Sequence, residues 1–205
     1  MAGKNCPQCG GPLQIPDLMS SAYRCPIHGD VAPVETAVLL DQDHLPGMIR
    51  SAQVPIWFAW PLPVAWVSAG IQRVGDSRSG AVAAVTALAG QSLTDGPSDL
   101  LIVSEQPGIG FGARLAGLPY FDPGEEIADT PCDTKVHAGR WITPLWSLAS
   151  PDRVVYVGES GGNWLWLIGW PAAVWSVIHD DLHLIDLRSA GPEVDIPAGA
   201  LTPRL

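Results

Sequence analysis

Short apolar runs bounded by turn-forming residues characterise the chain after residue 53. Runs rich in aliphatic, β-branched and aromatic side chains are typical of strands. They lie at 81–88, 100–103, 154–157, 164–168 and 182–187. The segment between the third and fourth runs contains three glycines, so these two runs are predicted to form a hairpin. The pattern therefore predicts a domain built mainly from short strands.

Helical patterns are few and short. One helix is predicted to end near Ser51, a second begins within the glycine-rich segment 108–118, and a third covers 172–179. The segments 92–98 and 122–133 are rich in turn-forming or acidic residues and are predicted to be loops. Many strands with few helices favour an α+β or mostly-β fold over a doubly wound sheet.

Four residues of the metal-ligating types lie near the N-terminus in two matched pairs. Two residues separate Cys6 from Cys9, two separate Cys25 from His28, and fifteen lie between the pairs. Each pair suits a tight turn that binds one side of a tetrahedral ion, and a glycine suited to positive φ follows each pair. Four protein ligands leave no position open for water. The spacing therefore predicts one structural Zn²⁺ in a zinc ribbon.

The chain is predicted to have four parts: a zinc ribbon at 1–30, a connector at 31–53, an α+β domain at 54–190 and an irregular C-terminal tail at 191–205. The sheet of the Trp-rich α+β domain is expected to be mostly antiparallel or mixed. A module of about thirty residues buries too little surface to fold alone, so the metal must stabilise it. Its predicted apolar filling consists of Leu13, Ile15 and Tyr23.

Two segments without charge, 54–71 and 163–178, call for a test of membrane insertion. The first contains prolines that would break a spanning helix. The second has 16 residues, fewer than the roughly 20 that a helix needs to span a bilayer. The N-terminus lacks the charged and apolar regions of a signal peptide. We expect no membrane span and a cytoplasmic location, where cysteines stay reduced and can bind metal.

The charge balance argues against nucleic acid as a partner. The chain has 11 basic and 21 acidic residues and a net charge of −10. Within 1–30 the charges of Lys4, Arg24, Asp17 and Asp30 cancel. Neither part has the basic stripe of a nucleic-acid binder. The expected partner is therefore another protein.

Ser160 lies in a Gly-Glu-Ser-Gly-Gly segment that fits the nucleophile elbow of serine hydrolases. That elbow needs a strand before the serine and a helix after it. The strand is predicted at 154–157, but 164–168 follows as a second strand and not as a helix. A hairpin turn explains the glycines equally well, so a hydrolase using Ser160 is an alternative.

A G-x-G-x-x-A sequence at 108–113 fits the dinucleotide-binding fingerprint. The fingerprint requires its first glycine directly after a strand, whereas residues 104–107 intervene between the predicted strand and Gly108. A flexible loop or bulge is the simpler interpretation.

His179 and His183 are four residues apart, the spacing of the two zinc ligands on a metallopeptidase helix. The strand pattern at 182–187 would turn the two side chains away from a common face, and the sequence offers no evident third ligand. A His179/His183 metal site therefore stands beside Ser160 as the second basis for a hydrolase.

Tryptophan accounts for nine residues, most of them in two clusters around 57–66 and 164–175. Core packing is the simpler interpretation of both clusters. Partly exposed members would instead indicate a binding face, because tryptophan is enriched at interaction hot spots.

Short stretches along most of the chain are typical of one family: the two metal half-motifs and residues 54–57, 60–64, 112–114, 144–146, 158–159, 164–166, 170–171 and 186–188. Through them the chain resembles a family of actinobacterial proteins of similar length and unknown function with an N-terminal zinc ribbon. The resemblance implies a fold unit and no reaction.

The sequence thus favours an uncharacterised cytosolic zinc-ribbon protein that acts as a non-enzymatic protein-interaction or regulatory module. Its predicted site is the metal set alone, with no catalytic or cofactor-binding residue. The alternatives are a small hydrolase and transcription-linked nucleic-acid binding through the ribbon.

Overall fold

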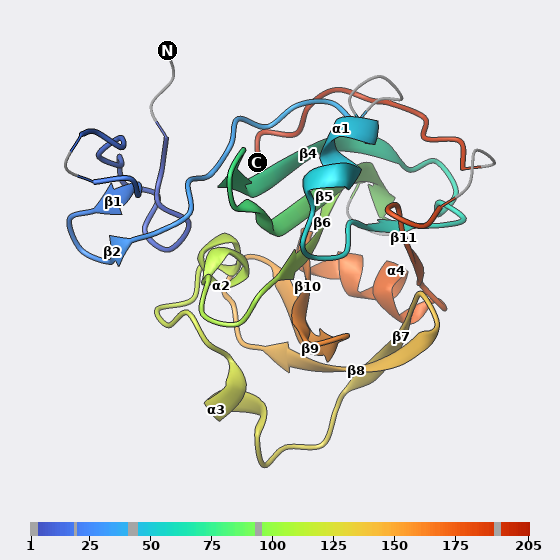
Figure 1. The fold of residues 1–205 in the computed structure, drawn as a ribbon. Helices are drawn as coiled ribbons and strands as arrows, with labels where there is room; N and C mark the ends of the chain where they lie inside the picture. The colour runs from blue at the N-terminus through green and yellow to red at the C-terminus, as the bar shows by residue number, and fades with distance from the viewer. Residues whose placement is uncertain (1–3, 19, 41–44, 93–95, 191–193) are drawn as a thin grey trace.

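The computed structural model describes residues 4–18, 20–40, 45–92, 96–190 and 194–205. Within them the N-terminal module contains a two-stranded sheet of β1 (Arg24–Cys25) and β2 (Gly29–Asp30). A nine-stranded sheet forms the body (Figure 1). Its strands are β3 (Trp57–Ala59), β4 (Val67–Asp76), β5 (Gly80–Ser92), β6 (Gly96–Glu105), β7 (Thr134–Ala138), β8 (Trp141–Leu148), β9 (Val154–Ser160), β10 (Asn163–Trp170) and β11 (His183–Asp186).

The helices of the described residues are short. They are α1 (Leu45–Ser51), α2 (Phe111–Ala116), α3 (Gly124–Ile127), α4 (Trp175–His179) and the 3₁₀ helix η1 (Ala172–Val174). The predicted helices near Ser51, after Gly108 and at 172–179 correspond to α1, α2 and η1 with α4. Across the described ranges, no helix has the length and apolar character needed to cross a membrane. The fold is mostly sheet with few helices, as the sequence predicts.

Four of the predicted strands lie within strands of the body, whereas the fifth, at 182–187, extends one residue beyond each end of β11. The glycines between 154–157 and 164–168 form the expected hairpin. Ser160 of β9 pairs with Asn163 of β10, and the two residues between them are Gly161 and Gly162. Their φ values are 62° and 79°. Positive φ at both central residues is the type I′ geometry that matches the twist of an antiparallel pair. The predicted loop at 92–98 is shorter, because β5 ends at Ser92 and β6 begins at Gly96, and residues 93–95 lie outside the described part.

Strand order in the body is β3-β11-β7-β8-β9-β10-β6-β5-β4. All neighbours in the described sheet are antiparallel except β11 and β7, which are parallel. The sheet is curled, so that β3 at one end of the strand order contacts β5 near the other end. Thr86 Oγ1 on β5 donates a 2.6 Å hydrogen bond to the Trp57 carbonyl on β3. Figure 1 shows the two halves, with β4–β6 on one side and β7–β9 on the other.

Each face of the curled sheet packs on its own apolar core. Along β10 the side chains alternate between the two, because successive residues of a strand point to opposite faces. Leu165 and Leu167 pack with β3, β11 and α4 inside the curl. Trp166 and Ile168 pack on the outer face, which α2 covers.

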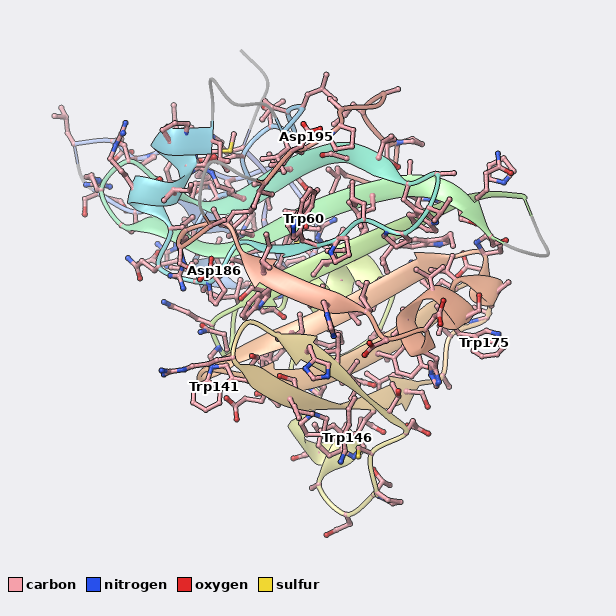
Figure 2. The ribbon with its side chains drawn as sticks, turned by 90° about the vertical axis from the view of Figure 1, so that its right-hand side faces the viewer. Trp60, Trp141, Trp146, Trp175, Asp186 and Asp195 are labelled. Carbon is pink, nitrogen blue, oxygen red and sulfur yellow. The ribbon has the colours of Figure 1, made fainter. Side chains whose placement is uncertain are left out.

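The tryptophan clusters are mainly core. Trp57, Trp66, Trp166 and Trp170 are at most 7% exposed. By contrast Trp175 at the start of α4 is 52% exposed and projects outward in Figure 2. Core packing is therefore the correct interpretation for most tryptophans of the two clusters.

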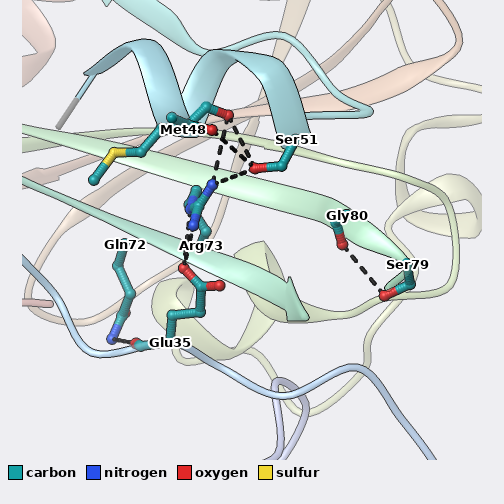
Figure 3. Close-up of polar contacts among 8 residues, drawn as sticks. Glu35, Met48, Ser51, Gln72, Arg73, Ser79 and Gly80 are labelled. Atoms are coloured by element: carbon teal, nitrogen blue, oxygen red, sulfur yellow. Dashed lines mark hydrogen bonds and ion pairs between the residues drawn. The ribbon is translucent and has the colours of Figure 1, made fainter. Parts of the chain in front are cut away.

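Arg73 on β4 ties Glu35 and helix α1 to the body (Figure 3). Its Nε and Nη2 donate to Glu35 Oε2 at 2.9 and 2.7 Å, and Nη1 donates to Ser51 Oγ at 2.8 Å. Gln72 adds a 3.0 Å bond to the Glu35 carbonyl. The segment after the N-terminal module and helix α1 therefore both pack on β4, while residues 41–44 between them lie outside the described part.

The C-terminal segment 194–205 has no helix or strand and lies beside the start of β4. Ser68 N donates to the Pro197 carbonyl at 2.8 Å, and Gly199 N donates to the Ser68 carbonyl at 2.7 Å. Thr202 is buried and its hydroxyl donates to Asp99. The segment thus covers the edge of the sheet, which otherwise presents unpaired backbone groups. Residues 191–193 of the predicted tail are outside the described ranges.

Candidate metal centre

A tight turn brings Cys6 and Cys9 together. Gly10 N donates to the Cys6 carbonyl at 2.9 Å, and Cys6 N donates to the Gly11 carbonyl at 2.8 Å. Gly10 has φ 71°, a conformation that favours glycine. The local sequence therefore determines the turn that presents the first two sulfurs.

The second turn connects β1 to β2. Cys25 pairs with Gly29 across this short hairpin, so His28 lies in the turn. Gly29 has φ 71°, the same value as Gly10. The two halves thus have related backbone geometry, as their matching sequences predict.

The four side chains converge on one point. Cys9 Sγ lies 3.7 Å from Cys25 Sγ, and His28 Nδ1 lies 3.5 Å from both Cys6 Sγ and Cys25 Sγ. All four ligating atoms are within 4.8 Å of one another. Zn–S and Zn–N bonds of about 2.3 and 2.0–2.1 Å in a tetrahedron separate two sulfurs by about 3.8 Å and a sulfur from a nitrogen by about 3.6 Å. The donor set and its spacing fit a tetrahedral metal ion.

Two of the ligands are buried and two are exposed. Cys6 and Cys25 are buried, whereas Cys9 and His28 face solvent. Hydrogen bonds from the backbone, with Ile27 the main contributor, lower the pKa of Cys25 to about 6. Burial raises the pKa of Cys6 to about 11. Metals bind the thiolate form of cysteine. The backbone amides around Cys25 stabilise its thiolate and so favour ligation, whereas the buried thiolate of Cys6 would need the positive charge of an ion.

Arg114 of α2 joins this cluster to the body. Its Nε donates a 2.8 Å hydrogen bond to the Pro7 carbonyl, within the first cysteine turn. Burial lowers the pKa of Arg114, and the charges of Cys6 and Cys9 oppose that shift. Three thiolates and a neutral imidazole around a divalent ion would carry a net charge of −1, which the Arg114 guanidinium would offset. Sequence reasoning missed this role, although a single arginine inside the apolar run 111–116 was a usable signal.

The apolar filling predicted for the module is wrong for Ile15. Leu13 and Tyr23 are half-buried, but Ile15 is 70% exposed. Backbone hydrogen bonds in the first turn and the pairing of β1 with β2 hold the two turns, and the module has little apolar interior.

Ser160 does not lie in a nucleophile elbow. The residue ends β9, a hairpin follows, and the next element is the strand β10 and not a helix. Its side chain is 2% exposed, and its hydroxyl has no hydrogen-bond partner among the residues that the structure describes. Within the described part of the chain, no base therefore lies within hydrogen-bond distance of this hydroxyl.

The glycine-rich segment at 108–113 does begin a helix, but the first amides of that helix already donate to a protein carboxyl group. Glu105, fully buried at the end of β6, accepts hydrogen bonds from Phe111 N and Gly112 N at 2.7 and 3.2 Å. Trp166 Nε1 donates to the same carboxyl group at 2.7 Å. Burial raises the pKa of Glu105 to about 7. A protein carboxyl group therefore occupies the position where a dinucleotide phosphate would bind.

His179 and His183 do not face each other. His179 Nε2 lies 2.8 Å from the Tyr156 hydroxyl, and its ring contacts Trp175 edge-on. His183 lies on β11, where its neighbour is His137 of β7. The spacing of four residues required a helix, but α4 ends at His179. The metal site predicted for His179 and His183 is therefore wrong, because the two side chains do not meet.

The chain was compared with known proteins and families. No curated protein and no solved structure matches it. A family model described as a family of unknown function, DUF6758, matches residues 1–205. Since the match covers the whole chain, the protein belongs to this family of unknown function.

Proposed function

We propose that Cys6, Cys9, Cys25 and His28 bind one structural Zn²⁺ and that the N-terminal module is a zinc ribbon. The ligand separations of 3.5 and 3.7 Å support this assignment, because they are close to those of a tetrahedral S₃N zinc shell. Four protein ligands close the shell, so the ion stabilises the fold and activates no water. Thiolate ligands stay available in a reducing compartment, and the cytosol is the proposed location.

The metal assignment is tested on the full chain. Zinc content after dialysis is expected to be one tightly held equivalent per chain. Cys6→Ser removes a ligand and is expected to abolish this equivalent, whereas Cys132→Ser, a half-buried thiol outside the cluster, keeps it. Replacement by Co²⁺ should give the intense thiolate-to-cobalt absorption of a Cys-rich site. Zinc retention by Cys6→Ser at the level of the unchanged protein contradicts the proposal.

The function we propose is protein–protein interaction through the ribbon. The observation that carries it is Ile27, which lies between the two ligands Cys25 and His28 and is 77% exposed. Ile15 and Leu18 of the same module are exposed as well. The turn between Cys25 and Gly29 presents Ile27 to solvent, and apolar residues that gather on one exposed surface are a feature of interaction sites. The net charge of −10 disfavours a nucleic-acid partner.

The interaction is tested by comparing three full-length variants of the tagged protein in its own cells. Ile27→Ser removes the apolar contact, Cys25→Ser removes the metal that orients it, and Ile142→Ser removes a similarly exposed isoleucine from β8. A partner protein is expected to be lost with the first two and kept with the third. Its affinity measured with purified proteins should fall by about 30-fold for Ile27→Ser, the effect of a hot-spot residue worth about 2 kcal/mol.

The same partners on all three variants would contradict the proposal. The hydrolase alternative gains no support from Ser160, whose hydroxyl lacks a base among the described residues. Covalent labelling of Ser160 by a fluorophosphonate would restore it. Salt-sensitive retention of DNA or RNA by the full chain, lost with Cys25→Ser, would restore the nucleic-acid alternative.

A further inference from the structure

We propose that His137, Asp181 and His183 form a second metal site, which takes a divalent first-row transition ion such as Zn²⁺. The site lies on the body and shares no residue with the N-terminal cluster. His137 belongs to β7, His183 to β11, and Asp181 to the turn that leads into β11. In Figure 2 the strand β11 faces the viewer, with α4 beside it.

Strand pairing places the two histidines side by side. β7 and β11 form the parallel pair of the described sheet, and His137 is directly opposite His183 in its register. Residues opposite each other in a sheet direct their side chains to the same face. The ring centroids are 4.5 Å apart with an angle of 72° between the planes. Two imidazoles are therefore held together by the backbone of the sheet.

Asp181 completes the set. Its Oδ1 lies 3.4 Å from His183 Nε2 and 4.0 Å from His137 Nε2. One ligating atom from each of the three residues lies within 4.8 Å of the other two. Metal bonds of about 2.0–2.2 Å in a tetrahedron separate a nitrogen from a carboxylate oxygen by about 3.4 Å. The His183 separation of 3.4 Å equals this value, and the His137 separation of 4.0 Å is longer.

Two local features also favour an ion. His183 Nε2 is sheltered from solvent and, within the described part of the chain, makes no hydrogen bond although it faces the Asp181 carboxylate. A sheltered polar atom without a hydrogen bond is rare in native proteins. Asp181 has φ 54°, an uncommon conformation for a residue other than glycine, and such residues cluster at functional sites.

A cavity adjoins the proposed ion. Asp181 and His183 line a pocket of about 590 Å³ together with residues 61–64, Trp66 and part of α4. Pockets for small molecules usually measure about 300–1,000 Å³. Three protein ligands leave at least one coordination position open, and two imidazoles with one carboxylate suit Zn²⁺, Co²⁺, Ni²⁺ or Fe²⁺. The open position would be filled by water or by a small oxygen ligand from the pocket.

The test uses the full chain with its N-terminal cluster already loaded with one equivalent of Zn²⁺. Further Zn²⁺ is added during isothermal titration calorimetry, and a second equivalent is expected to bind. His137→Ala and Asp181→Asn should each weaken this second equivalent at least tenfold. Asparagine tolerates the left-handed backbone of Asp181, so the second variant keeps the fold.

Matched controls come from the adjacent residues. Asp180→Asn removes an exposed acid next to Asp181, and His179→Ala removes the histidine that contacts Tyr156. Both should bind the second equivalent like the unchanged chain. Thermal unfolding of each variant verifies that its fold is kept.

NMR resonances of the histidine imidazole rings in the unchanged protein give a readout that needs no variant. Addition of the second equivalent should shift the resonances of His137 and His183 and leave those of His179 in place. Binding of only one equivalent overturns the proposal. So does a second equivalent that His137→Ala and Asp181→Asn leave unaffected, or one that shifts His179 alone.

Discussion

Arg114 Nε donates a 2.8 Å hydrogen bond to the carbonyl of Pro7, which lies between the first two cysteines of the candidate metal centre. The guanidinium also lies over the Phe111 ring, with Cζ 5.2 Å from its centroid. Gln8 adds a second contact, from its side-chain amide to the Gly108 carbonyl at 3.3 Å. Helix α2 and the loop before it therefore hold the N-terminal module against the body.

Arg114→Ala should release the module while the body remains folded. The bond joins a charged donor to a backbone carbonyl, and such bonds contribute about 1.5–3 kcal/mol. Backbone amides of residues 4–18 and 20–30 are expected to exchange with deuterium faster, and those of β5 and β6 at unchanged rates. Arg140→Ala, which removes an exposed arginine over the Trp141 ring, is the control. Equal exchange in both variants would show that Arg114 does not dock the module.

Glu105 should make stability depend on pH. Its pKa in the fold is about 7, above the ordinary value of 4.5, because the carboxyl group is buried. Between these values the folded protein keeps a proton that the unfolded chain has released. The free energy of unfolding should therefore fall as the pH rises from 4.5 to 7, by up to about 1.4 kcal/mol per pH unit.

Glu105→Gln isolates this effect, because glutamine keeps a carbonyl acceptor and does not titrate. Urea unfolding of both proteins across the same pH range gives the difference between their free energies at each pH. That difference should change through the window, while the contributions of the cysteines and histidines cancel. A difference that stays constant would mean that Glu105 has no raised pKa.

Gly112 is required by the close approach of Trp166. A Cβ atom built on Gly112 would lie 2.3 Å from the indole Cδ1 and Nε1 atoms. Gly112→Ala must displace the buried indole and its bond to Glu105, so it should destabilise the protein by about 1–3 kcal/mol or more. Gly47→Ala, at an exposed helical position with open space, should instead be neutral or stabilise by up to about 1 kcal/mol. Thermal unfolding compares the two.

Thr86 closes the curled sheet through its bond to the Trp57 carbonyl. Thr86→Val keeps the side-chain shape but leaves a buried carbonyl without this donor, which should cost about 1–3 kcal/mol. Thr143→Val is the matched control, because the Thr143 hydroxyl is buried without a hydrogen-bond partner in the described part of the chain. That change should be neutral or stabilising. Equal losses in the two variants would show that the Thr86 bond contributes nothing specific.

Local signals predicted much of the fold. The runs at 81–88 and 100–103 lie within β5 and β6, and the glycines after Ser160 form the turn between β9 and β10. Strands β3, β4, β7 and β8 were missed. β4 contains Gly70 and Gly75, and β8 contains a proline, so their composition resembles loops. Pairing with neighbouring strands determines these segments, and no local pattern reveals that pairing.

By itself the sequence determined the convergence of Cys6, Cys9, Cys25 and His28, because each pair lies in one tight turn whose geometry depends on adjacent residues. The positions of Glu105 and Arg114 beside helix α2, and of His137 beside His183, were decided only by the tertiary structure. In each case the partners come from separate elements, and their meeting depends on strand order and on the curl of the sheet. Such long-range pairing follows from burying two apolar faces at once, a property of the whole chain and of no single motif.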